Sequence, residues 1–432
     1  MSPQWQIPSC LVSAFGRTDR VKAMKILIVS QYFWPEAFRI NDIGRGLVGR
    51  GHDVTVLTGM PNYPKGRLYA GYGVVGPDRE NYEGVKIVRV PLCPRGKNSK
   101  WQLVVNYVSF FVFASCLGPF RLCRDYDVIF VYAPSPITVA LPGFVMGHLC
   151  KAPVLLWVQD LWPESLTAVG AVKSRLVLRL VARLVGWTYR RCSLLVVQSK
   201  GFIKEVQSYG IEPERICHLP NPAEELYRKM SLDSAARERK EVPDGFCVMF
   251  AGNIGVAQSF DTILDAAERT YSYRDIHWVI IGDGVSRERV ERQIRQRSLE
   301  ATVHLLGWKP VEAMARYLSL AEVLLVTLKR QPIFALTVPA KLQSYLACGK
   351  PIVSCLDGEG ARLVRESESG VAVPAEDSHG LAEAVVWLRS KSPEYRSELG
   401  RNGIRYCETH FSMKKVLDSL ERILATAVSG QS

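Results

Sequence analysis

Short apolar runs separated by helical stretches recur along the whole chain. In the first half they are KILIVSQ (25–31), DVTVLTG (53–59), VKIVRVP (85–91), VIFVYAP (128–134), PVLLWVQD (153–160) and LLVVQS (194–199). In the second half they are CVMFAG (247–252), HWVIIGDG (277–284), TVHLLGW (302–308), VLLVTL (323–328), PIVSCL (351–356) and GVAVP (370–374). Most lack alternation, which is typical of strands covered by helices on both faces. The pattern predicts an α/β protein with two doubly wound parallel sheets.

A stiff turn at Pro220, Asn221 and Pro222 follows the last apolar run of the first half. We therefore predict an N-terminal domain over 24–220, a C-terminal domain over 221–412, and a terminal helix and tail over 413–432. Residues 1–23 lack the continuous apolar core of a signal peptide, so we interpret them as a disordered or non-native extension before Met24. Two facing sheets would form a cleft at the carboxyl ends of their strands, where we expect the site.

One long apolar segment allows several interpretations. The twenty residues from Trp101 to Phe120 contain no charge, which is enough to span a membrane. Asn106 and two serines dilute the segment, and basic residues flank it on both sides. Three alternatives stay open: shallow insertion at a membrane surface, an ordinary buried helix, and a true span. A second uncharged run, 128–150, contains three prolines and is better interpreted as strand, loop and helix start.

Composition and charge limit the classes of binding partner that the chain could have. The chain has 432 residues, of which 47% are hydrophobic and 22% charged, so it is globular and too long for one core. Its 11 cysteines form no C-x-x-C pair and no zinc-like cluster, which suits a reducing cytoplasm. Residues 1–200 carry 25 Lys+Arg against 11 Asp+Glu, whereas 201–432 carry 30 against 31. This asymmetry favours an anionic membrane surface beside the first half. Nucleic acid is disfavoured, because no recognisable basic and aromatic module is present.

The stretch VPAKLQSYLACGKPIV (338–353) predicts a short helix with an open beginning. Pro339 can occupy the first turn, and Gly349 can end the helix in the left-handed region. Free N–H groups and the helix dipole attract an anion there, and Lys341 adds a full positive charge. A diphosphate would fit, although a surface lysine on a capped helix is the alternative.

Two glycine turns in the same half end predicted strands. They are FAGNIGVAQ (250–258) and VIIGDG (279–284), and their glycines would let backbone amides approach a phosphate. The glycines concerned are Gly252, Gly255, Gly282 and Gly284. No G-x-G-x-x-G follows the first strand, which disfavours a dinucleotide cofactor.

Polar residues also follow strands of the first half. Asp160 ends PVLLWVQD and precedes Glu164 by four residues, although an Asp before a helix is often only an N-cap. Glu36 and Arg39 follow the first strand. Residues 125–127 (Asp-Tyr-Asp) have the spacing of a metal-binding D-x-D motif but precede their strand, so we interpret them as a solvated turn and predict no metal.

Residues 24–425 resemble bacterial family-4 retaining glycosyltransferases of GT-B architecture, and more narrowly the N-acetyl-L-fucosaminyl transferase-like subgroup of O-antigen and capsule assembly. The matching stretches are SQYFWPE (30–36), VQDLWPESLTAVG (158–170), PNP (220–222), FAGNIGVAQS (250–259), VIIGDG (279–284), LLGW (305–308), FALTVPAKLQSYLACGKPIV (334–353) and DGEGARLV (357–364). The resemblance implies transfer of a sugar, expected to be an N-acetylated aminosugar, from a UDP-sugar to a polyprenyl-diphosphate-linked or polysaccharide acceptor. It also implies retention of configuration, a location at the inner face of the cytoplasmic membrane, and no cofactor. A UDP-sugar epimerase of the same fold and an inactive membrane-associated scaffold are the alternatives.

The resemblance assigns roles to individual residues. Asp160 and Lys341 are the predicted catalytic residues, with Asp160 orienting the acceptor hydroxyl or stabilising an oxocarbenium-like transition state. The predicted donor site comprises Gly252, Asn253, Gly255, Gln258, Gly282, Gly284, Trp308, Lys329, Arg330, Phe334, Thr337, Pro339, Lys341 and Ser344. The predicted acceptor site comprises Glu36, Arg39, Asn62, Tyr63, Trp162 and Glu164, although Asn62 and Tyr63 are equally consistent with a plain turn.

Two departures from the family pattern affect the donor site. The usual Glu-x7-Glu pair falls on Leu336 and Ser344, so both carboxylates are absent. The usual Arg and Lys of the glycine loop fall on Asn253 and Gln258. The charge of a diphosphate would therefore be borne by Lys341, with Lys329 and Arg330 as helpers, and by backbone amides. We expect a different set of donor contacts rather than a loss of activity.

Overall fold

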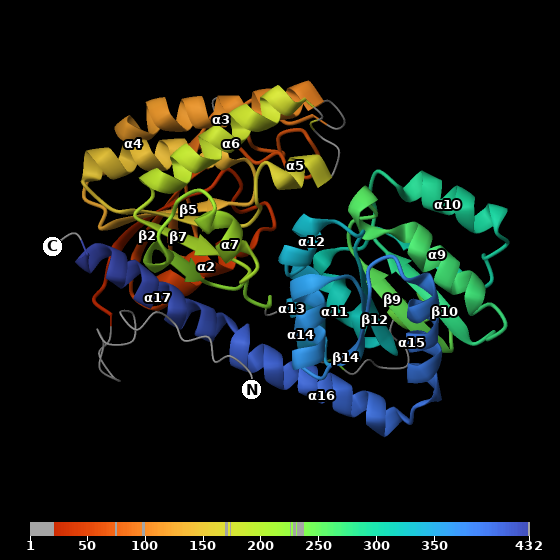
Figure 1. The fold of residues 1–432 in the computed structure, drawn as a ribbon. Coiled ribbons are helices and arrows are strands. Elements are labelled where there is room, and N and C mark those ends of the chain that lie inside the picture. Colours follow the sequence, from red (N-terminus) through yellow and green to blue (C-terminus); the bar gives the residue numbers. More distant parts are fainter. Residues whose placement is uncertain are drawn as a thin grey trace.

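The structure is a computed structural model that describes residues 21–73, 76–96, 100–168, 172, 174–224, 226–227, 230 and 237–430. Across these ranges the chain forms two parallel sheets, each covered by helices, in two lobes that face each other (Figure 1). The predicted α/β class with two Rossmann-like domains is confirmed. Most of the predicted N-terminal extension lies outside the described residues.

The N-terminal sheet has the strand order β3-β4-β2-β1-β5-β6-β7-β8. Its strands are β1 (Lys25–Val29), β2 (Asp53–Gly59), β3 (Arg79–Tyr82), β4 (Val85–Val90), β5 (Val128–Ala133), β6 (Val154–Val158), β7 (Leu194–Val197) and β8 (Ile216–His218). Neighbouring strands are parallel except β3 and β4, which pair antiparallel at one edge. All six strands predicted for this half are present. The edge strands β3 and β8 were not predicted, because each is short and neither contains a long apolar run.

The C-terminal sheet has the order β11-β10-β9-β12-β13-β14, and its paired strands are parallel. Its strands are β9 (Phe246–Ala251), β10 (Ile276–Ile281), β11 (Val303–Gly307), β12 (Val323–Thr327), β13 (Ile352–Cys355) and β14 (Gly370–Val373). These six strands match the six predicted runs. The carboxyl ends of both sheets lead into loops from which the candidate site residues come.

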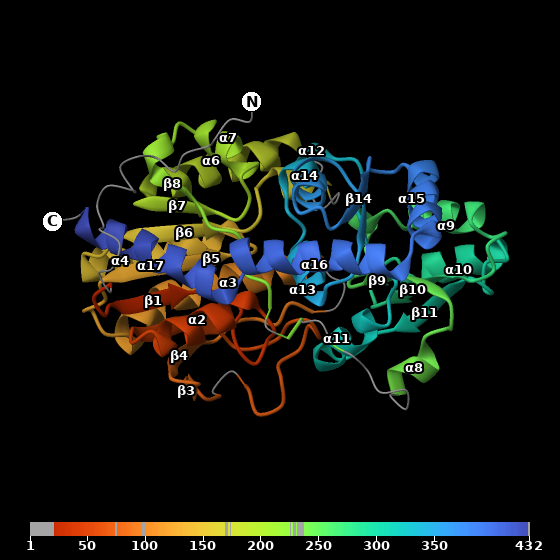
Figure 2. The same ribbon diagram turned by 90° about the horizontal axis from the view of Figure 1, so that it is seen from below.

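Helices cover both faces of the N-terminal sheet. One face carries α3 (Lys100–Arg121), α4 (Ala140–Cys150) and α6 (Arg175–Arg191), and the other carries α2 (Arg39–Gly49) and α17 (Met413–Ser429) (Figures 1 and 2). Two short helices, α5 (Glu164–Ala168) and α7 (Phe202–Gln207), lie near the ends of β6 and β7. The C-terminal domain contains α8 (Arg237–Glu241), α9 (Phe260–Arg269), α10 (Arg287–Gln296), α11 (Val311–Ser319), α12 (Pro332–Leu336), α13 (Ala340–Cys348), α14 (Gly358–Glu366), α15 (Ser378–Ser390) and α16 (Pro393–His410).

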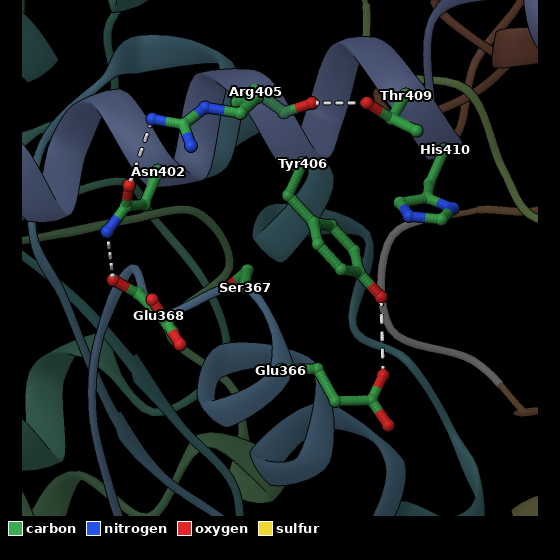
Figure 3. A pocket seen from close by; sticks show the side chains of 8 residues that line it. All are labelled: Glu366, Ser367, Glu368, Asn402, Arg405, Tyr406, Thr409 and His410. Atoms are coloured by element: carbon green, nitrogen blue, oxygen red, sulfur yellow. Dashed lines mark hydrogen bonds between the residues drawn. The ribbon is translucent and has the colours of Figure 1, made fainter.

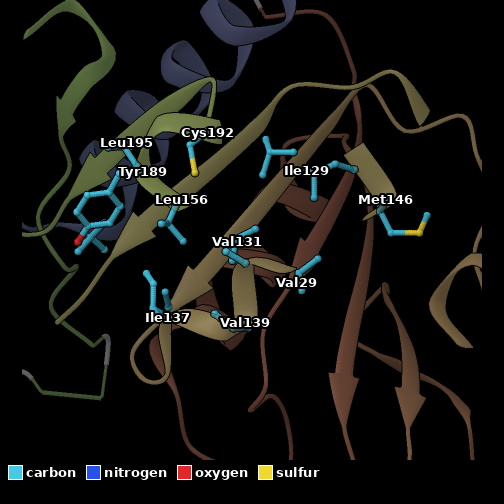
Figure 4. Packing of buried hydrophobic residues seen from close by; sticks show 14 of the residues in the cluster. Val29, Ile129, Val131, Ile137, Val139, Met146, Leu156, Tyr189, Cys192 and Leu195 are labelled. Atoms are coloured by element: carbon cyan, nitrogen blue, oxygen red, sulfur yellow. The ribbon is translucent and has the colours of Figure 1, made fainter. Parts of the chain in front are cut away.

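The continuous apolar character of the strands follows from this two-sided cover. In β1, Leu27 and Val29 pack into the core beneath α3, α4 and α6, whereas Ile26 and Ile28 pack beneath α2 and α17. Figure 4 shows the first of these cores, where Val29 and Val131 point from adjacent strands toward the covering helices. Alternate side chains therefore enter different cores, and both sets must be apolar.

The chain returns to the N-terminal domain at its end. Helix α17 packs Leu417, Leu420 and Leu424 into the core that contains α2. Arg50 pairs with Asp418 on α17 at 2.7 Å. The two crossings between the domains lie next to each other, since Ala223 donates its N–H to the Phe411 carbonyl at 2.8 Å.

Helix α3 buries only a narrow stripe. Asn106, Phe110, Ala114 and Gly118 lie four residues apart and face the protein, whereas much of the remaining circumference is exposed. Among the described residues, one helix is long enough and apolar enough to cross a membrane, and it is α3. Only 22% of its apolar window is buried inside the protein. The alternative of an ordinary buried helix is therefore wrong. The second uncharged run forms β5, a short loop and α4, as predicted.

Candidate active site

Helix α13 begins where the two domains meet. Pro339 stands at the N-cap, one residue before the first turn in which it was predicted, and has no side-chain cap. Gly349 ends the helix with φ 66°, as the sequence predicted. The first-turn N–H groups of Ala340 and Lys341 precede the regular hydrogen bonds of the helix. Arg39 of the N-terminal domain donates Nη2 to the Ala340 carbonyl at 2.8 Å. The open beginning of α13 thus lies against the opposite domain.

We call this contact the domain junction and define it by Arg39, Ser199, Glu224, Leu336 and Ala340. Ser199 donates its hydroxyl to the Leu336 carbonyl at 2.6 Å, and Arg39 pairs with Glu224 at 3.4 Å. Arg39 is buried, yet its Nη1 has no hydrogen-bond partner within the described part of the chain. A buried donor without a partner costs free energy, so a ligand oxygen at this point would be stabilising.

Lys341 is the cation at the start of α13. Its ammonium lies 3.5 Å from the centroid of the Phe250 ring. Among the described residues no carboxylate lies within 4.0 Å of it. Desolvation by the surrounding protein lowers the pKa of Lys341 to about 7. The charged form of Lys341 is therefore disfavoured when no anion is bound, and an anion would stabilise it.

The glycine turns differ from the prediction that their amides face a phosphate. The N–H groups of Gly252 and Gly282 donate to the carbonyls of Ile281 and Gly307 at 2.8 and 2.9 Å. Both glycines have positive φ, at 135° and 143°. A Cβ at Gly252 would lie 2.6 Å from Lys341 Cε, and a Cβ at Gly282 only 1.9 Å from the Gly252 carbonyl oxygen. These glycines therefore make room for Lys341 and for the close contact of the two turns.

The other two glycines donate to nearby side chains. Gly255 donates its N–H to Gln258 Oε1 at 3.1 Å, and Gly284 donates to Asp283 Oδ1 at 2.8 Å. The Asn253 side chain lies beside both glycines, 2.6 and 2.5 Å from the positions where a Cβ would stand. The N–H groups of Gly255 and Gly284 could release these side chains and bind a ligand instead. The N–H groups of Gly252 and Gly282 could not do so without breaking hydrogen bonds between strand ends.

The remaining predicted donor residues have diverse positions. Lys329 lies near Asp261. The pKa of Asp261 is lowered by hydrogen bonds from Gln293 and Arg289 and by the Arg289 charge, and the Lys329 charge makes a smaller contribution. Arg330 donates to the Ala375 carbonyl at 2.7 Å and lies 3.8 Å from Asp357, so its charge is partly neutralised.

Helix α12, the residue after it and α13 hold three more of these residues, which are Phe334, Thr337 and Ser344. Phe334 and Leu336 pack against the N-terminal core, so the first absent glutamate is replaced by a contact between the domains. Thr337 bonds the Ile333 carbonyl at 2.8 Å, and Ser344 is buried on α13. Trp308, in the loop after β11, is 68% exposed.

Asp160 follows β6 on the N-terminal side. Helix α5 begins at Glu164, so the alternative that Asp160 is its N-cap is wrong. Solvent reaches the carboxylate, but the dense surrounding protein desolvates it and raises its pKa to about 6. Burial raises the pKa of Tyr132, on which the charges of Arg39, Asp160 and Glu224 also act, so these groups lie near one another.

Three predicted acceptor residues form a compact cluster. Glu36 Oε1 accepts the N–H groups of Asn62 and Tyr63 at 2.7 and 2.6 Å. Its other oxygen is buried without a partner among the described residues, and burial raises the pKa of Glu36 to about 7. The rings of Tyr32 and Tyr63 are tilted, with centroids 5.6 Å apart. Glu36 fixes this loop, and its second oxygen can accept a ligand hydroxyl.

Of the other three predicted acceptor residues, Arg39 lies at the domain junction, and Trp162 and Glu164 lie apart from the cluster. Trp162 packs against the N-terminal core. Solvent reaches Glu164, but desolvation by the surrounding protein and the Glu205 charge raise its pKa. Its neighbours are thus on α7 rather than at Asp160.

Sequence reasoning missed several junction residues. Glu224, Tyr132 and Ser199 lie at the junction, and Phe250 lies beneath Lys341. Ser199 and Tyr132 stand near the carboxyl ends of predicted strands, a signal that could have drawn attention to them. Phe250 carried no such signal, because an aromatic residue within a predicted strand is normally interpreted as part of the hydrophobic core.

The Asp-Tyr-Asp sequence is an irregular stretch before β5 with a bend at Asp127, and its two aspartates are exposed whereas Tyr126 is buried. Asp127 accepts the Lys25 N–H at 2.6 Å, and Asp125 pairs with the Lys25 ammonium. Both lie at the amino end of β5, away from the junction. In the described ranges no group of three or more His, Cys, Asp or Glu side chains could hold a metal ion.

A pocket of about 220 Å³ lies between the end of α14 and α16. Figure 3 shows Tyr406 pointing to Glu366 and Asn402 reaching the Glu368 carbonyl. Its polar groups largely satisfy one another, and no predicted site residue lines it.

Two family profiles match the chain in order. The profile described as "Glycosyl transferase 4-like domain" matches residues 37–222, and the one described as "Glycosyl transferases group 1" matches residues 245–391. These ranges contain the N-terminal strands β2 to β8 and the whole C-terminal sheet.

Individual relatives are bacterial glycosyltransferases. The putative colanic acid biosynthesis glycosyl transferase WcaI of Escherichia coli is 25% identical over 339 residues, covering 76% of this chain and 82% of WcaI. The N-acetylgalactosamine-N,N'-diacetylbacillosaminyl-diphospho-undecaprenol 4-alpha-N-acetylgalactosaminyltransferase of Campylobacter jejuni is 24% identical, covering 45% of this chain and 51% of its own length. The amylovoran biosynthesis glycosyltransferase AmsK of Erwinia amylovora is 29% identical, covering 42% of this chain and 41% of AmsK.

Solved structures share the fold. Sucrose-phosphate synthase from Thermosynechococcus elongatus superposes with a TM-score of 0.71 at 17% identity, covering 94% of this chain and all of that one. HepE of Anabaena, in complex with UDP and glucose, gives 0.66 at 17% identity, covering 93% of this chain and all of HepE. The two profiles together cover most of the chain, and the chain therefore belongs to the family-4, group 1 glycosyltransferases of GT-B architecture.

Proposed function

We propose that the protein transfers an N-acetylated aminosugar from a UDP-sugar to a polyprenyl-diphosphate-linked saccharide or a growing polysaccharide, with retention of configuration. The product would be an O-antigen or capsule precursor made at the inner face of the cytoplasmic membrane. The names of WcaI and AmsK support a role in surface polysaccharide, and that of the Campylobacter enzyme supports a lipid-diphosphate acceptor.

The desolvated lysine at the start of α13 is the observation that carries this proposal. Lys341 and the open N–H groups belong to the first turn of α13, next to Ala340 of the junction, and the Lys341 ammonium lies against Phe250. A diphosphate at this turn would be stabilised by charge and by hydrogen bonds. Because negative charge grows on the diphosphate as the glycosidic bond breaks, these groups would bind the transition state more tightly than the ground state.

Asp160 is proposed as the acceptor-side residue. With a pKa of about 6 it is mostly ionised at neutral pH, and no hydrogen bond to its carboxylate occurs among the described residues. Such a carboxylate can orient an acceptor hydroxyl, take up its proton or stabilise positive charge on the sugar. Arg39 Nη1 and Glu36 Oε2 are both buried and have no partner among the residues that the structure describes. They are candidates for contacts with sugar hydroxyls in place of the absent glutamates.

The decisive measurement is UDP release from a panel of UDP-sugars, with and without bacterial polyprenyl-diphosphate saccharides. We expect release with one or a few aminosugar donors and only with an acceptor. An isomerised UDP-sugar formed without acceptor would instead indicate an epimerase. UDP binding without turnover of any donor would indicate a scaffold.

Substitution of Asp160 tests its proposed catalytic role separately from binding of the diphosphate. Asp160→Asn should lower turnover roughly 100-fold while leaving UDP affinity within about twofold, because the diphosphate contacts are intact. The exposed Glu212→Gln is the matched control and should leave both unchanged. Full turnover by Asp160→Asn would remove this residue from the mechanism.

A further inference from the structure

The outward side of α3 is unusually apolar for a surface helix. Trp101 is 73% exposed and Phe120 86% exposed, and between them lie further exposed apolar side chains. These are Val104, Val108, Val112 and Phe113. Contiguous exposed apolar surface of this kind marks an interaction site in soluble proteins.

The outward side of α6 combines apolar and basic residues. Leu176 is 66% exposed and Leu180 54% exposed. Arg175, Arg179 and Arg183 alternate with them, form no ion pair with any described residue, and have no acidic neighbour within α6. A helix with exposed leucines and unpaired arginines is typical of a peripheral membrane contact.

Both helices belong to one layer. Helix α4 packs against α3, and its Phe144 meets Trp187 of α6 at a ring distance of 5.6 Å. The three helices cover the same face of the N-terminal sheet, at the outer side of the molecule (Figure 1). We call the outward surface of α3, α4 and α6 the three-helix face.

We propose that the three-helix face docks on an anionic lipid bilayer, with the apolar side chains of α3 entering the interface and the arginines of α6 contacting lipid phosphates. The charge of this half complements that of an anionic bilayer, because the first 200 residues carry an excess of 14 positive charges. A second copy of the chain is a poorer occupant, since pairing two such faces would oppose their arginines.

Shallow docking fits the inner side of α3 better than a span does. Asn106 accepts a hydrogen bond from Gln31 Nε2 at 2.7 Å and donates to the Cys93 carbonyl at 2.7 Å. Asn106 also lies 3.4 Å from Asn62, which belongs to the Glu36 loop. The helix could not leave the sheet for lipid without breaking these buried bonds. The same bonds connect the docked helix to the loop proposed to hold the acceptor.

Vesicle flotation tests the docking without any sugar donor, so its result is independent of the proposed transfer. The full chain should float with phosphatidylcholine vesicles that contain roughly one third phosphatidylglycerol, and less with phosphatidylcholine alone. The triple change Arg175→Gln, Arg179→Gln and Arg183→Gln should weaken binding to the anionic vesicles roughly 100-fold. The change Trp101→Ser, Val108→Ser and Phe120→Ser should weaken it at least about tenfold on both vesicles.

Matched controls use exposed residues of the C-terminal domain and of α17. Arg269→Gln, Lys414→Gln and Lys415→Gln remove the same charge and should leave flotation unchanged. Trp387→Ser with Tyr395→Ser removes exposed apolar surface elsewhere and should also have no effect. Wild-type protein that stays with neither vesicle, or face variants that bind as well as wild type, would overturn the proposal. So would a dimer in sedimentation that the α3 variants convert to monomer, since a second copy would then cover the face.

Discussion

At the scale of single residues, the molecule holds a lysine in surroundings that disfavour its charge. Lys341 lies over an aromatic ring, no carboxylate of the described ranges lies within 4.0 Å of its ammonium, and desolvation lowers its pKa to about 7. Binding of a diphosphate would restore the charged form, because an opposite charge raises the pKa of an ammonium. Donor binding and proton uptake should therefore be coupled.

This coupling gives UDP affinity a defined pH dependence. Below pH 7 the free protein already carries the charged lysine, so affinity should be nearly constant. Above pH 7 binding must take up a proton, so affinity should fall by up to about tenfold per pH unit. Titration calorimetry in two buffers of different ionisation enthalpy measures both the UDP affinity and the number of protons taken up on binding. In Lys341→Met the slope should disappear and affinity at pH 7 should drop roughly 10- to 100-fold.

The same residue should lower the stability of the fold. Because the pKa of Lys341 is depressed in the folded state, the unfolded chain binds more protons between pH 7 and about 10.5. Lys341→Met should therefore raise the Tm at pH 7 and below, and the gain should shrink as the pH rises toward 10. Thermal unfolding at several pH values checks this. The exposed Lys204→Met is the control, and an equal gain at all pH values would contradict the assignment.

At the scale of elements, the turns after β9 and β10 show where sequence reasoning succeeded and failed. It located the strands, the glycines and the start of α13 correctly, because each has a local signature. It assigned the amides of Gly252 and Gly282 to a ligand, whereas they pair with Ile281 and Gly307. The sequence shows that a glycine is required at a position, but not which neighbour requires it.

The contact between Gly252 and Lys341 can be tested directly. Gly252→Ala would place a Cβ 2.6 Å from Lys341 Cε at a φ of 135°. We expect a loss of about 1–3 kcal/mol in the free energy of unfolding, together with weaker UDP binding. Urea unfolding and calorimetry measure the two effects. Gly49 is the last residue of α2, and a Cβ added there would meet no described atom within 4 Å beyond its chain neighbours and the backbone of its own helix. Gly49→Ala should therefore change neither quantity by more than about 0.5 kcal/mol.

The domain junction was beyond prediction for a different reason. Arg39 and Ala340 are separated by 301 positions, and their contact depends on how two complete domains dock. Hydrophobic periodicity predicts each domain separately, since alternate strand residues enter two local cores. The residues that meet between the domains have no shared pattern along the chain.

At the scale of the whole molecule, the last helix stabilises the first domain. Leu420 of α17 is fully buried in the core beneath α2. Leu420→Ala should cost about 2–5 kcal/mol, and the loss should appear in urea unfolding followed by circular dichroism. Lys415→Ala on the exposed side of α17 should cost less than about 0.5 kcal/mol. Similar losses from both changes would mean that helix propensity, rather than core packing, holds α17 in place.

The hydrogen bond between Ala223 and Phe411 has a mechanical consequence. Two chain segments tie the lobes together, and because they are fastened to each other they act as a single pivot. Any opening must then swing about this point, and it must also break the hydrogen bond of Ser199 to the Leu336 carbonyl. If the first lobe docks on a membrane as proposed, it can stay still together with α17 while the second lobe rocks away to exchange the proposed nucleotide.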